Sequence, residues 1–144
     1  MYTKFISKNA EETIKFGEKI AKILKKGDIL CLQGELGSGK TTFVRGLAKG
    51  LHIKQDAVHS PTFTLMNVYQ GKKETPLFHF DLYRVEKIEQ IISLDYEDFL
   101  YGDGISVVEW SEKLGMLMPK KYWAVHFSHK SENQRQIILR KYSA

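Results

Sequence analysis

The sequence has little cysteine and no long hydrophobic run, and these absences exclude several classes of protein. Its 144 residues include one cysteine, Cys31, so an internal disulfide cannot form and no cysteine-based zinc motif is present. No apolar stretch approaches the roughly 20 residues that a membrane-spanning helix needs. Residues 1–7 lack the apolar segment of a secretion signal. A cytoplasmic protein with no membrane attachment is therefore expected, with Cys31 as a small buried hydrophobic residue.

Arginine is also scarce. The chain has 22 basic and 17 acidic residues, a net charge of +5, and its arginines are Arg45, Arg84, Arg135 and Arg140. With so few arginines to stabilise the transition state of a phosphoryl transfer, fast nucleotide hydrolysis is expected to need a partner. Lysine pairs at 25–26, 72–73 and 120–121 fall in predicted loops or at the ends of elements. We interpret these pairs as solvated charge, because such clusters commonly lie at the surface without a ligand.

The most specific motif is the run Gly34-Glu35-Leu36-Gly37-Ser38-Gly39-Lys40-Thr41, which matches the phosphate-binding loop G-x-x-x-x-G-K-[ST]. A strand-like run at 28–33 precedes it and a helical pattern at 42–49 follows, as the motif requires. Its glycines let backbone N–H groups face the phosphates, and Lys40 adds a positive charge. A nucleoside triphosphate is therefore predicted to bind here, with the Thr41 hydroxyl on magnesium. The predicted binding residues are Gly34, Gly37, Ser38, Gly39, Lys40, Thr41 and Thr42.

Two acidic residues are candidates for the carboxylate that a hydrolysing phosphate loop needs near magnesium. Glu109 follows the β-branched run 105–108 and is predicted to lie at the carboxyl end of a central strand, where α/β sheets bind ligands. Asp81 lies near the end of a second predicted strand. It either orients water or magnesium-bound water, or is a structural carboxylate paired with Arg84.

Thr62 and Trp110 each have two possible interpretations, whereas the histidines have one. Thr62, after Ser60-Pro61, is either a switch-type hydroxyl that senses the terminal phosphate or simply the first residue of a strand. Trp110 either packs near the nucleotide or fills the core. The histidines, His79 among them, lack the sequence context of a catalytic triad and are interpreted as structural.

The pattern along the chain predicts a single α/β domain over residues 1–144. A capping box formed by Asn9 and Glu12 predicts a first helix running to about Lys26, with Ile23 on its buried side. Antiparallel hairpins are predicted from strands at 62–69 and 77–83 and from strands at 123–128 and 136–141. Helices are predicted at 85–94 and 96–100.

Four segments together resemble a known family. They are residues 34–42, Ser60-Pro61-Thr62-Phe63-Thr64-Leu65, His79-Phe80-Asp81-Leu82-Tyr83-Arg84 and Val108-Glu109-Trp110-Ser111-Glu112-Lys113. In this order they are similar to the TsaE family of bacterial tRNA threonylcarbamoyladenosine biosynthesis proteins, and the resemblance covers nearly the whole chain. It implies a three-layer P-loop NTPase-like fold, in which helices flank a mixed β-sheet that carries antiparallel hairpins.

The resemblance also implies a function. Members of this family are small magnesium-dependent ATPases that join TsaB and TsaD proteins in threonylcarbamoyl transfer to tRNA, with tRNA contacted indirectly. By resemblance, Thr41 and Glu109 hold magnesium, Thr62 and Asp81 assist ATP hydrolysis, and Trp110 lies close to the nucleotide. The loops near 9–11 and 132–134 are expected beside the base.

Other functions that use the same loop fit the sequence less well. A regulatory GTPase would carry Asn-Lys-x-Asp and Asp-x-x-Gly, and neither string occurs in the chain. A P-loop small-molecule kinase is the alternative enzyme, although such enzymes usually clamp phosphates with an arginine-rich lid that this sequence lacks. A module that binds ATP without hydrolysing it is the third possibility, and it differs from the first only in whether the acidic residues support turnover.

Overall fold

The computed structural model describes residues 2–35, 37–61, 64–71 and 75–143. Its elements, in chain order, are β1 (Tyr2–Ser7), α1 (Ala10–Ala21), β2 (Ile29–Gln33), α2 (Lys40–Gly50), the 3₁₀ turn η1 (Gln55–Ala57), β3 (Met66–Tyr69), β4 (Leu77–Asp81), α3 (Ile88–Ile92), α4 (Tyr96–Leu100), β5 (Ile105–Glu109), η2 (Ser111–Leu117), β6 (Tyr122–His129) and β7 (Arg135–Tyr142). Strands and helices together form the α/β fold that the sequence predicts.

All seven strands join one mixed sheet in the order β1-β7-β6-β2-β5-β4-β3. Strand β2, which leads into the phosphate loop, lies between β5 and β6 and runs parallel to both, and β4 runs parallel to β5. The predicted hairpins β3–β4 and β6–β7 are confirmed as antiparallel pairs. The carboxyl ends of β2, β4 and β5 therefore meet at one edge of the sheet, where ligands bind in open α/β sheets.

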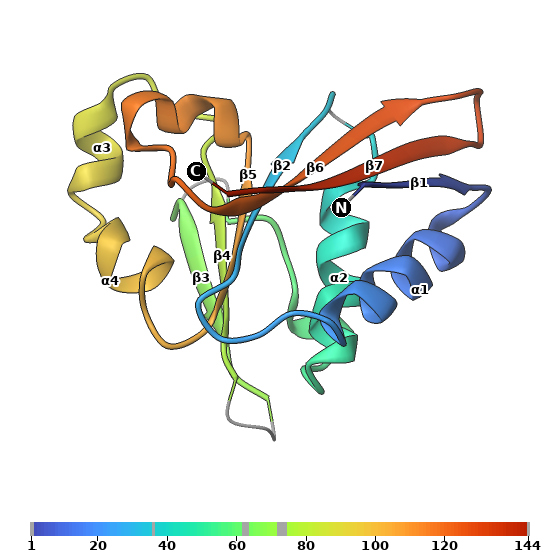
Figure 1. The fold of residues 1–144 in the computed structure, drawn as a ribbon, viewed down its shortest axis with the longest axis horizontal. Coiled ribbons are helices and arrows are strands. Elements are labelled where there is room, and N and C mark those ends of the chain that lie inside the picture. Colours follow the sequence, from blue (N-terminus) through green and yellow to red (C-terminus); the bar gives the residue numbers. More distant parts are fainter. Residues whose placement is uncertain (1, 36, 62–63, 72–74, 144) are drawn as a thin grey trace.

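Helices cover the two faces of the sheet and make three layers (Figure 1). Helices α1 and α2 pack on one face, where Leu30 and Leu32 of β2 point, and α3, α4 and η2 pack on the other face, where Cys31 points. This alternation buries both faces of β2, as is usual for central parallel strands. In the part of the chain that the structure describes, no helix has the length and apolarity needed to cross a membrane.

The first helix begins as predicted but ends early. The Asn9 side chain accepts a hydrogen bond from the Glu12 amide at 2.8 Å, which confirms the N-terminal cap. The helix ends at Ala21 rather than near Lys26, and Ile23 is 51% exposed, so its predicted burial is wrong. The chain turns away because Asp28 accepts the Lys25 amide and the Gly27 amide bonds to Gly104, which directs it into β2.

Three other predicted elements are shorter in the structure. Strand β3 begins at Met66, since Leu65 has a positive φ of 68° that extended strands do not adopt, and positions 62 and 63 of the predicted strand lie outside the described residues. Strand β4 ends at Asp81 rather than at 83. Helix α3 spans Ile88–Ile92 rather than 85–94, because the Gln90 side chain accepts the amides of Glu86 and Lys87 and so sets a later start. Helix α4 matches its predicted bounds.

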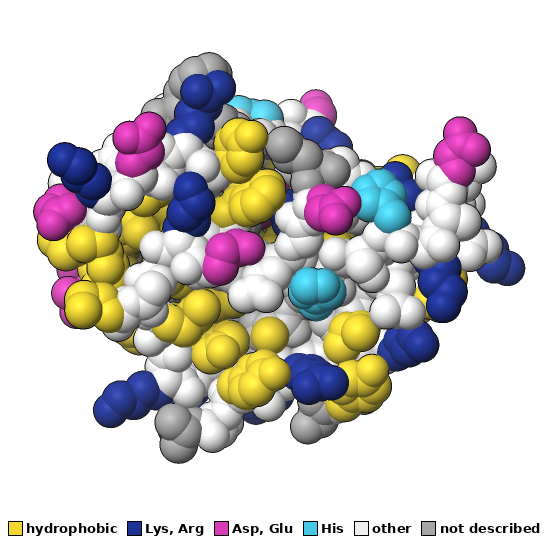
Figure 2. Space-filling view, turned by 90° about the horizontal axis from the view of Figure 1, so that it is seen from above, with side chains coloured by type: hydrophobic (Ala, Val, Ile, Leu, Met, Phe, Trp, Pro, Cys, Tyr) yellow, Lys and Arg dark blue, Asp and Glu magenta, His cyan; other side chains and the backbone are white. Residues whose placement is uncertain are grey.

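The lysine pairs are exposed wherever the structure describes them. Lys25, Lys26, Lys120 and Lys121 are all exposed, and positions 72 and 73 lie outside the described residues. On the face seen from above, basic side chains are scattered over the surface and its rim instead of gathering in one patch (Figure 2). This distribution agrees with the interpretation of the lysine pairs as solvated charge.

Helices α1 and α2 cross at glycines, which predicts a strong effect of a single added methyl group. A Cβ atom on Gly46 would lie 2.2 Å from the Ile14 carbonyl oxygen, and one on Gly17 would lie 2.5 Å from the Phe43 carbonyl oxygen. We expect Gly46→Ala to destabilise the fold by about 1–3 kcal/mol through overpacking, measured as a lower Tm in calorimetry. Lys19→Ala, at an exposed position of α1, is the control, and a Gly46→Ala variant as stable as this control would contradict the close crossing.

Candidate functional site

The loop between β2 and α2 adopts a backbone that requires glycine. Gly34, Gly37 and Gly39 have φ values of 149°, 75° and 101°, in the region that residues with a Cβ atom rarely adopt. At Gly34 a Cβ atom would also lie 2.6 Å from the Phe127 carbonyl oxygen. The loop therefore passes close against β6 and turns directly into α2, whose first residue is Lys40.

Lys40 is held inside the site. Its Nζ atom donates to the Gly34 carbonyl at 2.5 Å and lies 3.7 Å from the centre of the Trp110 ring. Burial lowers the pKa of Lys40, and the negative charges of Glu109, Glu112 and Asp81 oppose that shift. The side chain is thus a preorganised cation at the mouth of the loop, next to a ring whose face favours positive charge.

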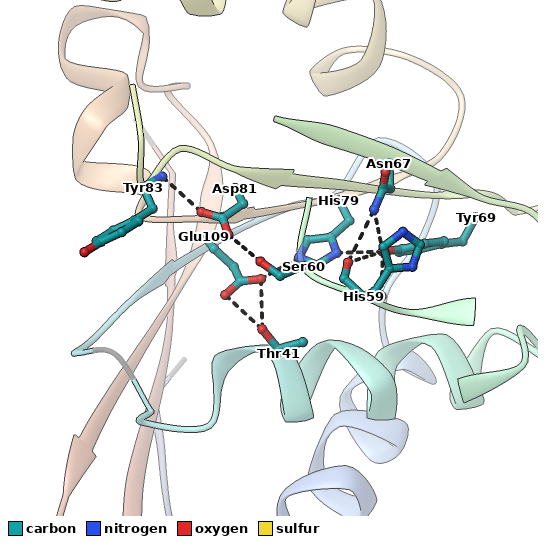
Figure 3. A network of polar contacts seen from close by, with 9 residues as sticks. All are labelled: Thr41, His59, Ser60, Asn67, Tyr69, His79, Asp81, Tyr83 and Glu109. Atoms are coloured by element: carbon teal, nitrogen blue, oxygen red, sulfur yellow. Dashed lines mark hydrogen bonds and ion pairs between the residues drawn. The ribbon is translucent and has the colours of Figure 1, made fainter. Parts of the chain in front are cut away.

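The two predicted acidic residues come together at the edge of the sheet. Asp81 and Glu109 end the parallel strands β4 and β5 and are direct neighbours in their register. Both are buried, with 4% and 3% of their surface exposed. The Thr41 hydroxyl lies 3.4 Å from each carboxylate oxygen of Glu109. The structure thus brings Thr41 and Glu109, separated by 68 positions in the sequence, to one point below the loop (Figure 3).

Thr41 and Glu109 suit magnesium, which takes few protein ligands, better than they suit a metal that is held by protein side chains alone. Among the described residues, no group of three or more His, Cys, Asp or Glu side chains is arranged to hold a metal. Magnesium is commonly held by one or two carboxylates together with phosphate oxygens and water. Ser38 adds a second sign of a phosphate site, because its fully buried hydroxyl has no hydrogen-bond partner among the described residues. A magnesium–triphosphate unit would supply partners to these groups.

Asp81 is fixed by two hydrogen bonds. It accepts the Ser60 hydroxyl at 2.8 Å on one oxygen and the Tyr83 amide at 3.0 Å on the other. Ser60 lies two positions before Thr62, the predicted switch-type hydroxyl, which lies outside the described residues. The backbone leading to Thr62 is therefore tied to Asp81 (Figure 3).

The site is an open pocket of about 620 Å³, large enough for a nucleotide. Its lining includes Lys40, Thr41, Thr42, Asp81, Glu109 and Trp110. The lining also includes Asn9, the N-cap of α1, and Ala10, its first residue, together with Glu132 and Asn133 in the β6–β7 turn. Both segments expected beside the base therefore border the pocket. Arg135 also lines it and donates to the Gly37 carbonyl at 3.4 Å.

Trp110 both borders the pocket and packs against the core, the two possibilities that its sequence position leaves open. It lines the pocket over Lys40 and also packs, partly buried, against the apolar core under α3 and α4. Its backbone has a positive φ of 58°, uncommon for a residue other than glycine. The Tyr83 ring lies 5.0 Å from the Trp110 ring, centre to centre. This turn after β5 directs the indole toward the phosphate loop.

His79 belongs to the site although the sequence analysis interpreted it as structural. His79 is fully buried in β4, and its Nε2 atom lies 2.5 Å from Oε2 of Glu109. Its other ring nitrogen lies 3.0 Å from the Tyr69 hydroxyl. The structural interpretation of His79 is therefore incomplete, because the ring touches the candidate magnesium carboxylate. The signal that could have identified it is its spacing, two positions before Asp81 on one strand, which puts both side chains on the same face.

Comparisons with known proteins identify one family to which this chain is similar. The profile of the family described as Threonylcarbamoyl adenosine biosynthesis protein TsaE matches residues 7–137. A Treponema pallidum (strain Nichols) relative named tRNA threonylcarbamoyladenosine biosynthesis protein TsaE is 36% identical over 134 residues, which span 93% of this chain and 97% of the relative. A relative of the same name from Aquifex aeolicus (strain VF5) is 49% identical over 109 residues, spanning 75% of this chain and 76% of the relative.

A solved structure supports the same conclusion. The crystal structure of YdiB from Bacillus subtilis is similar to this fold with a TM-score of 0.78 and 28% sequence identity, over 100% of this chain and 87% of the other. The mixed seven-stranded sheet is therefore confirmed as the P-loop NTPase-like fold that the resemblance implies. With a family match over residues 7–137 and a phosphate loop folded in its expected place, the chain belongs to the TsaE family.

Proposed function

We propose that this protein binds and hydrolyses ATP with magnesium, as an accessory to the threonylcarbamoyl modification of the adenosine next to the tRNA anticodon. In this proposal it cycles on and off a complex of TsaB and TsaD proteins, and it meets tRNA through them. The observation that carries the proposal is the approach of Thr41 and Glu109, 3.4 Å apart, beside Lys40 in a pocket of nucleotide size.

Each residue has a part in the proposed reaction. The loop amides, the Ser38 and Thr42 hydroxyls and Lys40 bind phosphate oxygens, and Trp110 packs beside the nucleotide. Thr41 and Glu109 hold magnesium, which when bound neutralises phosphate charge and orients the triphosphate. Asp81, fixed by Ser60 and Tyr83, accepts a hydrogen bond from the attacking water and aligns it. Thr62 completes the set on the γ-phosphate side.

The scarcity of arginine among the described pocket residues explains why fast ATP hydrolysis is expected to depend on partner proteins. Among the described residues that line the pocket, Arg135 is the one arginine, and it already bonds to the Gly37 carbonyl. A cation that arrives with a partner stabilises the transition state of other P-loop enzymes by about 10³–10⁵-fold in rate. Slow turnover by the isolated chain is therefore the expected starting point.

The test is magnesium-dependent ATP hydrolysis by the purified chain, alone and with TsaB and TsaD. We expect the partners to raise kcat at least about tenfold, in the manner of other P-loop enzymes completed by a partner. The control omits magnesium in both arms. Fast turnover that ignores the partners and rises with a small-molecule acceptor would replace the proposal with the P-loop kinase alternative.

A further inference from the structure

A buried chain of hydrogen bonds leads away from Glu109 on the side opposite the phosphate loop. His79 lies at its centre, with Nε2 2.5 Å from Oε2 of Glu109 and Nδ1 3.0 Å from the Tyr69 hydroxyl. His79 is fully buried and Tyr69 is 5% exposed. Figure 3 shows His79 and then Tyr69 to the right of Glu109, with Thr41 below Glu109.

The direction of the first hydrogen bond follows from its partners. An ionised carboxylate only accepts hydrogen bonds, so Nε2 of His79 carries the proton that it shares with Glu109. The Tyr69 hydroxyl has one proton and two acceptors within reach, Nδ1 of His79 and the His59 carbonyl at 2.9 Å. Whichever acceptor takes the Tyr69 proton, Nε2 of His79 still donates to Glu109. The orientation of the Glu109 carboxylate is therefore set by the ring and not by solvent.

The far end of the chain anchors the segment that leads to Thr62. The Tyr69 hydroxyl lies 2.9 Å from the His59 carbonyl oxygen, and Asn67 donates to the same carbonyl at 3.3 Å. The next residue, Ser60, donates to Asp81. The backbone at 59–60 is thus connected to both acidic residues of the site, to Asp81 directly and to Glu109 through Tyr69 and His79.

We propose that His79 and Tyr69 are positioning residues that orient Glu109 for magnesium. His79 holds Oε2, so Oε1 is the oxygen available to magnesium beside the Thr41 hydroxyl, which lies 3.4 Å from both oxygens. Tyr69 fixes the rotation of the imidazole. The pair does for this carboxylate what outer-shell partners do for the ligands of other metal sites, where their loss reduces metal affinity or activity by about 10–100-fold. This inference rests on the proposed magnesium–ATP function and adds two residues to it.

The competing explanation is that His79 is only a satisfied polar residue of the core. Both explanations predict lower stability when the ring is removed, since a buried hydrogen-bonded group is lost. The two explanations differ in whether a substitution that restores the hydrogen-bond donor to Glu109 also restores magnesium-dependent binding. Gln places an amide N–H near the position of Nε2, so His79→Gln keeps a donor for Glu109, whereas His79→Leu keeps the bulk and removes the donor.

The experiment measures binding of a non-hydrolysable ATP analogue by calorimetry, with magnesium and with EDTA. We expect His79→Leu to reduce the magnesium-dependent part of the affinity about 10–100-fold, with affinity in EDTA unchanged. His79→Gln should recover most of it. Tyr69→Phe should reduce it about tenfold in the wild-type background and have no further effect in His79→Leu, because the two residues act as one unit.

Matched controls make the same kinds of substitution, of a tyrosine and of a histidine, at positions outside the Glu109 hydrogen-bond chain. Tyr122→Phe deletes a hydroxyl on β6 and His126→Gln changes an exposed histidine, and neither should alter magnesium dependence. Equal losses in His79→Leu and His79→Gln, or additive effects of Tyr69→Phe, would overturn the proposal. Because the readout is binding, a wild-type chain that binds magnesium–ATP without hydrolysing it would contradict the proposed activity while still testing His79. A wild-type chain with no magnesium-dependent affinity would overturn both.

Discussion

Glu109→Gln is expected to abolish most ATP hydrolysis while the phosphate loop still binds ATP, with a loss of magnesium-dependent affinity at least as large as that expected for His79→Leu. The substitution keeps the shape of a side chain that is 3% exposed and ends β5, but removes the negative charge that faces Thr41. A bound magnesium ion contributes several kcal/mol to stabilising transition-state charge, and each 1.36 kcal/mol is a factor of ten in rate. We expect kcat to fall about 100-fold or more, measured by phosphate release under saturating ATP.

The matched control is Glu97→Gln, which removes the same charge from an exposed position of α4. Its kcat should equal that of the wild type. Tm values of both variants separate a loss of chemistry from a loss of fold. Undiminished turnover by a folded Glu109→Gln protein would remove Glu109 from the magnesium site and make Asp81 the remaining candidate.

Lys40→Ala is expected to have its largest effect on binding. Lys40 is the phosphate-loop cation, lies 4% exposed between the Gly34 carbonyl and the Trp110 ring, and is the first residue of α2. Removing one member of a buried, hydrogen-bonded charge pair costs about 2 kcal/mol or more. That corresponds to a loss of about 30-fold or more in ATP affinity, measured by calorimetry.

The control for this variant is Lys49→Ala, at the other end of the same helix, where the ammonium forms an ion pair with Glu18 at 3.7 Å. It removes the same charge from α2 without touching the pocket. ATP affinity should be unchanged in Lys49→Ala. Equal affinities in both variants would mean that long-range charge, and not contact at the loop, accounts for phosphate binding.

Much of the site could be predicted because its signals are local. The phosphate loop is one continuous segment, and its glycines lie at the positions where the backbone has positive φ. Asn9 and Glu12 specify the start of α1 within four residues. Glu109 follows an apolar run, so its place at a strand end could be inferred before the strand's neighbours were known. Boundaries were harder, as at Ala21, because contacts with Gly104 and Asp28 decide them.

By itself, the sequence determined the phosphate loop and the two acidic candidates, because each depends on residue type and spacing within a few positions. It also determined the fold class and the family, because four such local motifs occur in one order along the chain. The tertiary structure alone decided what these groups touch. The register of β4 beside β5 puts His79 against Glu109 across 30 positions, and the return of β7 brings Arg135 to the loop across 98. Such contacts depend on strand order and register, which long-range packing sets and local patterns do not record.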